Sequence, residues 1–253
     1  MKTKLAEARL ALRSVAAAGV LMLAFATEAG AVVETLQNLI NKTGPLAGVI
    51  TVEDKEFSNF TFGGNSISAT KTITLGDLAN IQVSDLFTAS AAFPGSATVQ
   101  PGPGLRFADT GSILDVTGSS DTVDFVFGYD VKVIGALNTI TGSAIQAIQP
   151  GDVAVGGGGT VIVSMDTASF PTLFFDGATT AFADGVFASP LTLLTVGTNV
   201  VLFGFGSGTT ADLNAFEQRF EQTLVPEPGA WFLLAVGLGT LALVSLRRRS
   251  MAG

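Results

Sequence analysis

The side chains on which most enzymes rely for nucleophilic and metal chemistry are missing from this sequence. Its 253 residues include no histidine and no cysteine. Without them the chain cannot build a Ser-His-Asp triad, a thiol nucleophile, a histidine- or thiolate-ligated metal site or an iron–sulfur cluster. The catalytic groups that remain are pairs of carboxylates, as in glycoside hydrolysis, and lysine.

Asp121, Asp124 and Asp130 place three acidic residues within ten positions. Asp124 and Asp130 fall on one face of a predicted strand, where their separation along the chain corresponds to about 20 Å. The two carboxylates of a glycosidase stand only about 5–9.5 Å apart. A pair formed between different strands stays open, but no pattern in the sequence points to one. We therefore predict that the protein is not an enzyme.

Two kinds of loop raise the question of a cofactor. "GSSDTVD" (118–124) offers oxygen ligands of the kind that calcium prefers, but it lacks the spacing of an EF-hand loop, and a polar hairpin turn explains it equally well. "GGGG" (156–159) and "FGFGSGTT" (203–210) are rich in glycine, yet neither continues into the Gly-Lys-Ser/Thr of a phosphate-binding loop. We expect both to connect strands, and we expect no cofactor, with calcium as the alternative left open.

The charge of the chain bears on its partners. Residues 32–224 carry six lysine and arginine residues and 18 of the 21 acidic residues, a formal charge of −12. Such a surface repels phosphate backbones, so nucleic acid is not an expected partner. The single tryptophan, Trp231, lies in the C-terminal segment, and the single tyrosine, Tyr129, is expected in the core with most of the phenylalanines. An aromatic platform for sugars is therefore not expected, while recognition of polysaccharide by polar groups stays open.

The composition of residues 32–224, rich in Gly, Thr, Ser, Val and Phe, favours strands and turns. The clearest strand is "DTVDFVFGYDVKV" (121–133), whose strict alternation predicts one buried and one solvent-facing side. "ISATKTITL" (67–75) shows the same alternation. Because turn-forming runs separate many short strands, we predict one antiparallel, jelly-roll-like β-sandwich domain. The shorter candidate strands are "GVITV", "KEFSNFTF", "IQVSDLF", "GLRF", "SILDV", "TVIVSM", "LTLLTV" and "NVVLFGF".

Three further segments carry mixed or helical patterns. "ALNTITGSAIQAI" (136–148) fits a strand or a short helix. "DLNAFEQRFEQTL" (212–224) places Phe216 and Phe220 at positions that share a face in either structure. "VETLQNLINK" (33–42) predicts a helix.

Residues 1–31 have the layout of a secretory signal peptide. Four cations at the start precede the apolar run "VAAAGVLMLAFA" (15–26), and small residues follow that permit cleavage after Ala26 or after Ala31. An apolar run of this length is short for a membrane span, which takes about 20 residues. We therefore predict a cleaved signal helix and export by the secretion machinery, with an uncleaved N-terminal anchor as the alternative.

Residues 225–250, "VPEPGAWFLLAVGLGTLALVSLRRRS", combine prolines, an apolar run and a basic end. The 17 residues from 230 to 246 carry no charge, and as a helix they would reach about 26 Å, enough for the hydrocarbon core of a bilayer. Basic residues favour the cytoplasmic side, which places residues 32–224 outside. We thus predict a transmembrane helix over 230–246, followed by a cytoplasmic stop formed by Arg247, Arg248 and Arg249.

The succession of "VPEPGA", an apolar span and "RRR" resembles the PEP-CTERM sorting signal of Gram-negative bacteria. The resemblance covers residues 225–249 and implies that Pro226, Glu227 and Pro228 are read by an exosortase, a membrane transpeptidase-like enzyme of species that make exopolysaccharide. It further implies that the protein is anchored transiently in the inner membrane and then reaches the cell surface or the extracellular matrix. An ordinary tail anchor with a proline-bearing linker is the alternative.

Three segments of the central domain are similar to recurrent segments of exported proteins of that group, namely "VEDKEFSNFTF" (52–62), "PGPGLRF" (101–107) and "FVFGYDVKV" (125–133). Glu53 stands where that pattern would place a glycine. The resemblance implies a β-sandwich of no assigned activity. We therefore expect an exported, non-enzymatic surface or matrix protein, with a calcium- or polysaccharide-binding module of the exopolysaccharide matrix as the alternative.

Overall fold

The computed structural model describes residues 32–66, 69–87, 102–118, 120–135, 138–147, 149–167, 169–177 and 182–224. The predicted signal peptide, the motif Pro226–Pro228, the apolar segment 230–246 and the three arginines lie outside these residues. In the part that is described, no helix is both long and apolar enough to cross a membrane.

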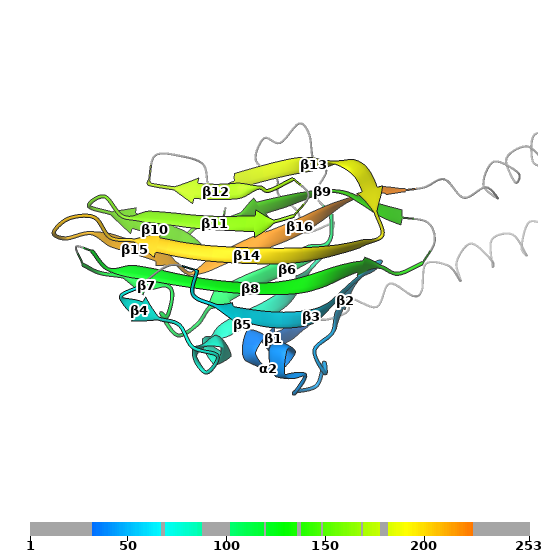
Figure 1. Cartoon of the computed structure of the whole chain (residues 1–253), viewed down its shortest axis with the longest axis horizontal. Coiled ribbons are helices and arrows are strands. Elements are labelled where there is room, and N and C mark those ends of the chain that lie inside the picture. The colour runs from blue at the N-terminus through cyan, green and yellow to red at the C-terminus, as the bar shows by residue number, and fades with distance from the viewer. Residues whose placement is uncertain are drawn as a thin grey trace, which may run out of the picture. The chain divides into compact units, whose positions relative to one another are not determined.

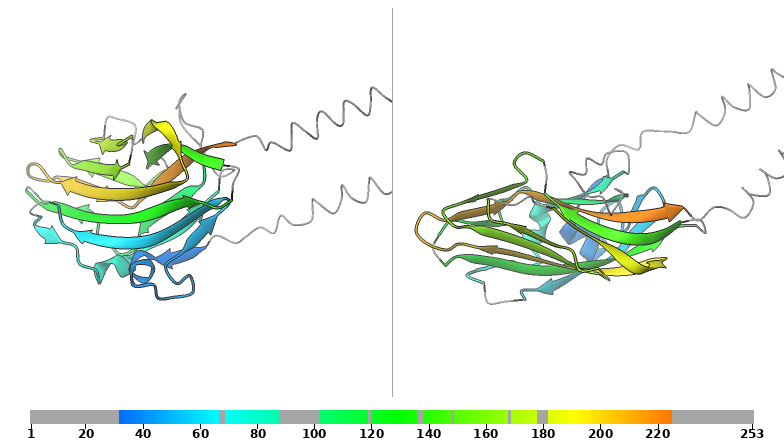
Figure 2. Two further views of the ribbon diagram at one scale, coloured as in Figure 1. Left: turned by 45° about the vertical axis from the view of Figure 1, so that its right-hand side comes forward. Right: turned by 90° about the horizontal axis from the view of Figure 1, so that it is seen from above.

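Two antiparallel sheets face each other in this domain (Figures 1 and 2). Their outer strands also approach one another, because β12 of one sheet lies beside β13 of the other and β2 lies beside β5. In spatial order, sheet A consists of β1 (Val33–Thr35), β5 (Ile81–Leu86), β6 (Gly104–Asp109), β16 (Ala215–Leu224), β9 (Asn138–Gln146) and β13 (Phe182–Leu191). Sheet B consists of β12 (Thr172–Phe175), β11 (Thr160–Asp166), β14 (Leu193–Phe203), β8 (Thr122–Val133), β3 (Lys55–Gly64) and β2 (Ile50–Val52), with β4 (Lys71–Thr72) paired parallel to β8.

Smaller elements complete the domain. A three-stranded sheet contains, in order, β10 (Val153–Gly156), β15 (Thr210–Leu213) and β7 (Asp115–Val116). The helical elements are α2 (Leu36–Asn41) and the 3-10 helix η1 (Asp77–Asn80). The Thr35 hydroxyl caps α2 by accepting a hydrogen bond from the Asn38 N–H (3.2 Å), so the helix predicted in residues 33–42 begins after a short strand.

Aromatic side chains fill the space between sheets A and B. Alternate residues of β8 point inward and are buried, as the alternation in the sequence predicts. Their rings meet rings of sheet A: the centroids of Phe127 and Phe107 are 5.0 Å apart, and those of Tyr129 and Phe220 are 6.4 Å apart. The prediction of an all-β, sandwich-like fold with antiparallel sheets is confirmed.

β16 is a central strand of sheet A, with β6 on one side and β9 on the other. Phe216 and Phe220 point toward sheet B, while Glu217 and Arg219 lie on the opposite face and are buried as well. A strand that is covered on both faces does not need to alternate polar and apolar residues. For this reason the sequence of segment 212–224 was compatible with both a helix and a strand. The segment forms strands, and segment 136–148, which was also ambiguous, forms β9.

The strand predicted over residues 67–75 is wrong for most of its length. The described part of this stretch contributes only the two-residue strand β4. Thr74 donates hydrogen bonds to the Asp77 carboxylate from its N–H (2.8 Å) and from its hydroxyl (2.7 Å), and the chain turns there into η1. Such local bonds compete with strand pairing. Strands β10, β12 and β13 were not predicted, and "LTLLTV" and "NVVLFGF" form the single strand β14.

The two-residue turn between β2 and β3 holds Glu53 with a φ of 52°. A positive φ at the first central residue is the geometry of a type II′ hairpin turn, which favours glycine there. A side chain in this left-handed region is strained. The glycine expected at position 53 from the sequence resemblance thus has a backbone reason, and this chain carries glutamate in its place.

Candidate functional site

A groove runs across the outer face of sheet B, and its floor is made of glycines. Gly63 lies on β3, Gly128 on β8 and Gly197 on β14, three neighbouring strands (Figure 1). Gly128 pairs directly with Gly197 across the strands, and Thr61 pairs with Gly128 from the other side. Because no side chain rises from these positions, the sheet surface is hollowed there. The groove has a volume of about 470 Å³, and the side chains that contribute to its lining include Thr61, Val126, Asp166, Thr167 and Thr195.

Polar groups that accept hydrogen bonds stand along this groove. Asp130 lies beside the groove: its carboxylate accepts from the hydroxyl of Thr195, which lines the groove (2.7 Å), and from the side-chain amide of Asn59 (2.8 Å). Asp166 is exposed at the groove, and its carboxylate makes no hydrogen bond or ion pair with the described part of the chain. Among the residues that the structure describes, those lining the groove include no lysine or arginine. The groove therefore suits a ligand that donates hydrogen bonds and carries no negative charge.

Exposed phenylalanines lie on the same face of sheet B beyond the groove. Phe174 on β12 is 46% exposed and pairs with Ile162 of β11. Phe203 at the end of β14 stacks on Phe205, with centroids 5.6 Å apart, and Phe205 is 62% exposed. The sequence assigned most phenylalanines to the core, and these positions depart from that expectation. The local sequence could have indicated the exposure of Phe203 and Phe205, because they flank a glycine at the start of a turn.

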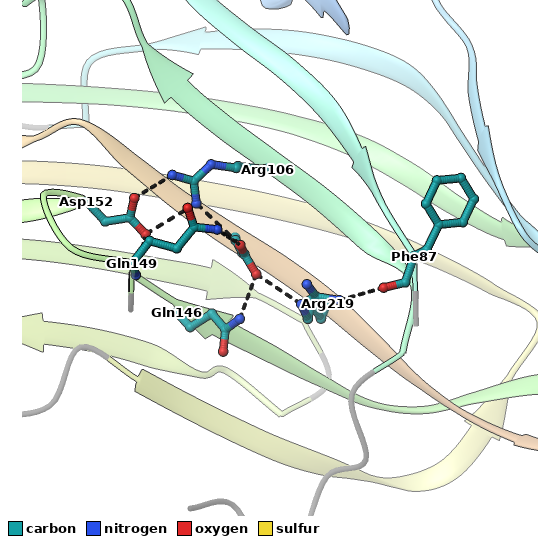
Figure 3. Close-up of polar contacts among 7 residues, drawn as sticks. Phe87, Arg106, Gln146, Gln149, Asp152 and Arg219 are labelled. Atoms are coloured by element: carbon teal, nitrogen blue, oxygen red, sulfur yellow. Dashed lines mark hydrogen bonds and ion pairs between the residues drawn. The ribbon is translucent and has the colours of Figure 1, made fainter. Parts of the chain in front are cut away.

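A buried ionic network lies on the opposite side of the domain, on the face of sheet A that points away from sheet B (Figure 3). Glu217 accepts hydrogen bonds from Arg219 Nε (3.0 Å), Gln146 Nε2 (2.6 Å), Arg106 Nη1 (3.3 Å) and Gln149 Nε2 (3.3 Å). Strand register brings these groups together, because Glu217 pairs with a residue of β6 on one side and of β9 on the other. The sequence contains no signal for this network, since its members come from distant segments.

Asp152 joins this network through a bidentate contact with Arg106. Arg106 Nη1 lies 3.3 Å from an oxygen of Asp152 and 3.3 Å from an oxygen of Glu217, so the two carboxylates are no farther apart than those of a glycosidase pair. However, both are almost fully buried and both are engaged by guanidinium or amide donors. Neither is free to reach a glycosidic bond, and the arrangement is that of a structural ion cluster.

The acidic residues singled out in the sequence do not assemble into one site. Asp124 and Asp130 lie on the same face of β8, as predicted, but Asp124 is fully buried and accepts from the Ser66 hydroxyl (2.7 Å), while Asp130 lies beside the groove, bonded to the lining residue Thr195. Asp121 lines a separate cavity of about 250 Å³. Among the described residues, no group of three or more acidic side chains is placed to hold a metal ion. The glycine runs 156–159 and 203–210 connect β10 to β11 and β14 to β15, as expected.

A buried chain of hydrogen bonds connects sheets A and B through Tyr129 and Gln218. The Tyr129 hydroxyl donates to Gln218 Oε1 (2.6 Å), and Gln218 Nε2 donates to Thr198 Oγ1 (2.9 Å), so this chain crosses from β8 through β16 to β14. Burial raises the pKa of the Tyr129 phenol well above its ordinary value. Burial also lowers the pKa of the Lys55 amine, which contacts the Asp54 carboxylate (2.7 Å). The Tyr129 phenol and the Lys55 amine are both buried inside the domain, and neither residue belongs to the lining of the groove.

The fold and the groove together define an all-β domain with an open groove on one sheet, whose lining combines apolar surface with a few polar side chains. No protein-family model and no curated protein sequence matches the chain. Among solved structures, the chain is similar to the enzymatically active domain of tailspike protein 4 of bacteriophage CBA120, with 11% sequence identity and a TM-score of 0.25. The similarity covers 66% of this chain and 20% of that one, and at this TM-score it carries no inference about fold or function.

Proposed function

We propose that this protein is an exported, non-enzymatic component of the cell surface or extracellular matrix, and that its jelly-roll-like β-sandwich binds polysaccharide in the groove of sheet B. The observation that carries the proposal is the groove itself, about 470 Å³ in volume and floored by Gly63, Gly128 and Gly197. A sugar chain presents hydroxyl donors along its length, and the carboxylates of Asp166 in the groove and of Asp130 beside it are acceptors for them. The exposed phenylalanines on the same face add apolar surface for the carbon face of a sugar ring.

The negative charge at the groove favours neutral over acidic polysaccharides. As far as the described residues go, its lining holds the Asp166 carboxylate and no cation, and residues 32–224 carry a formal charge of −12. A chain of uronic acids would be repelled by both. We therefore assign a neutral polysaccharide as the ligand class.

A substitution that fills the groove tests whether the ligand binds there. Gly63→Val places a branched side chain over the floor, where a Cβ meets Val126 Cγ1 at 3.2 Å and Val126 Cβ at 3.3 Å, contacts that a shift of a few tenths of an ångström relieves. Gly76→Val is the matched control, because Gly76 has an ordinary φ of −65°, precedes η1 and leaves its Cβ 3.6 Å from the nearest atom. Calorimetric titration of the full chain with neutral glucan oligosaccharides is expected to show binding by the wild type and by Gly76→Val.

For Gly63→Val we expect the affinity to fall at least about tenfold, which corresponds to the loss of one or two hydrogen bonds. A polyuronate of equal length is expected not to bind any variant. Binding of the neutral oligosaccharide by Gly63→Val as tightly as by the wild type would show that the groove is not the site.

The sorting of the protein is the second part of the proposal, and it is supported by the order of segments in the sequence. The signal peptide 1–31 would direct export, and the span 230–246 with the cytoplasmic Arg247–Arg249 would hold the chain in the inner membrane until an exosortase reads Pro226, Glu227 and Pro228. In the described domain β16 ends at Leu224, two positions before Pro226 in the sequence.

Mass spectrometry of the mature protein from the cell surface tests this part. We expect a C-terminus upstream of Trp231, and we expect Glu227→Gln to accumulate in the inner membrane. Recovery of surface protein that still carries the segment from Trp231 to Arg249 would contradict processing.

A further inference from the structure

The chain leaves the sandwich at one particular end. The backbone of Leu224, the last residue of β16, pairs with Asn138 at the start of β9. The same end carries the β2–β3 turn, the connection from β8 to β9 and the turn from β13 to β14, and it lies at the right of Figure 1. We call it the exit end. The pairs Lys55–Val133 and Leu193–Lys132 place these turns side by side.

A buried cluster fixes the last part of β16 at the exit end. Lys55, whose side chain is fully buried, donates from Nζ to Gln222 Oε1 (2.5 Å) and to Asp54 Oδ1 (2.7 Å). Asn138 Nδ2 donates to Asp54 Oδ2 (2.6 Å). These contacts join the β2–β3 hairpin of sheet B to β9 and β16 of sheet A. The segment that follows Leu224 therefore starts from a fixed point on the folded domain.

The length of chain between this point and the apolar segment is short. Only residues 225–229 separate Leu224 from Ala230. An extended chain spans at most about 3.6 Å per residue, so the start of the apolar segment lies no more than roughly 20 Å from the exit end. A domain tethered so closely to a membrane span keeps the same end toward the lipid.

The exit end also exposes aliphatic side chains. Ile134, in the connection from β8 to β9, is 46% exposed, and Leu193, at the start of β14, is 56% exposed. Exposed aliphatic groups gain free energy when an interface removes them from water. We propose that the exit end, through Ile134 and Leu193, rests on the lipid surface of the membrane while the chain is anchored, an inference that rests on the proposed span over residues 230–246.

The test uses single cysteines as labelling sites, which the chain allows because it has none of its own. Ile134→Cys and Leu193→Cys carry a polarity-sensitive fluorophore at the exit end, and Phe205→Cys carries it at the other end of β14, whose 11 residues reach more than roughly 30 Å. Leu238→Cys reports on the proposed span itself. All three domain positions are exposed, so labelling leaves the core intact.

The labelled full chain is reconstituted into phosphatidylcholine vesicles that contain a quencher attached to the lipid. We expect loss of fluorescence at positions 134, 193 and 238 and none at position 205. Quenching at 238 without quenching at 134 and 193 overturns this inference and leaves the anchoring intact. Absence of quenching at 238 contradicts the anchoring itself. Shielding of 134 and 193 before vesicles are added assigns the exit end to a second copy of the chain and also overturns the inference.

Discussion

Tyr129 shows how much a single side chain contributes to this fold. Its ring packs against Phe57 (centroids 6.1 Å apart) and Phe60 (5.4 Å), and its hydroxyl reaches Gln218 across the sandwich. A buried phenol resists ionisation because the phenolate loses its hydration. The pKa of Tyr129 is therefore raised well above its ordinary value of 10.0, and the unfolded chain releases this proton before the folded one does. Stability must then fall as the pH rises above 10.0.

The first prediction uses the fact that Tyr129 is the only tyrosine, so the ultraviolet absorbance of phenolate reports on it alone. We expect the phenolate signal to appear only together with the loss of β-sheet circular dichroism in an alkaline titration. A phenolate transition near pH 10.0 in a protein that keeps its β-sheet signal would contradict the burial of this hydroxyl.

The second prediction concerns ion pairs in two environments. Arg219→Met leaves the buried Glu217 without its Nε donor and frees the carbonyls of Phe87 and Gly102, so we expect the free energy of unfolding to fall by about 3–5 kcal/mol. Lys71→Met is the control, since its pair with Asp115 is partly exposed and should cost about 1 kcal/mol or less. Urea unfolding measures both, and equal losses would show that the network is not a buried one.

At the scale of elements, the sequence predicted what one strand shows by itself. The alternation of β8 marked its buried face, and the glycine runs marked strand connections. The sequence did not decide between strand and helix for the segments that form β9 and β16. Both faces of these strands are covered, so polar and apolar residues do not alternate along them. The groove was not predictable, because Gly63, Gly128 and Gly197 become neighbours only through strand register. The ionic network around Glu217 escaped prediction for the same reason.

The third prediction belongs to the β2–β3 hairpin. Glu53→Gly removes the strain of a side chain at φ 52°, and we expect it to stabilise the protein by roughly 0.5–1 kcal/mol after the entropic cost of glycine. Glu53→Ala, which keeps the strain, should give no such gain. A thermal melt of the two variants measures the difference, and an equal or lower midpoint for the glycine variant would contradict the turn geometry.

At the scale of the whole molecule, the described domain offers two distinct surfaces. The groove crosses the middle of sheet B, where β3, β8 and β14 run side by side, whereas the chain toward the sorting motif leaves from the exit end (Figure 1). The proposed ligand site is thus separate from the proposed attachment point. On this account, a protein held by its C-terminal segment keeps the groove available to a neutral polysaccharide.

Binding of a neutral polysaccharide in the groove is the central claim, and an NMR titration of the full chain with a neutral oligosaccharide tests it most directly. The backbone amide signals of Gly63, Gly128 and Gly197 are expected to shift in parallel with increasing ligand, because these glycines form the groove floor. That of Gly104, on β6 of sheet A, is expected to stay in place. Unchanged signals of the three floor glycines at a ligand concentration that shifts other residues would contradict the claim.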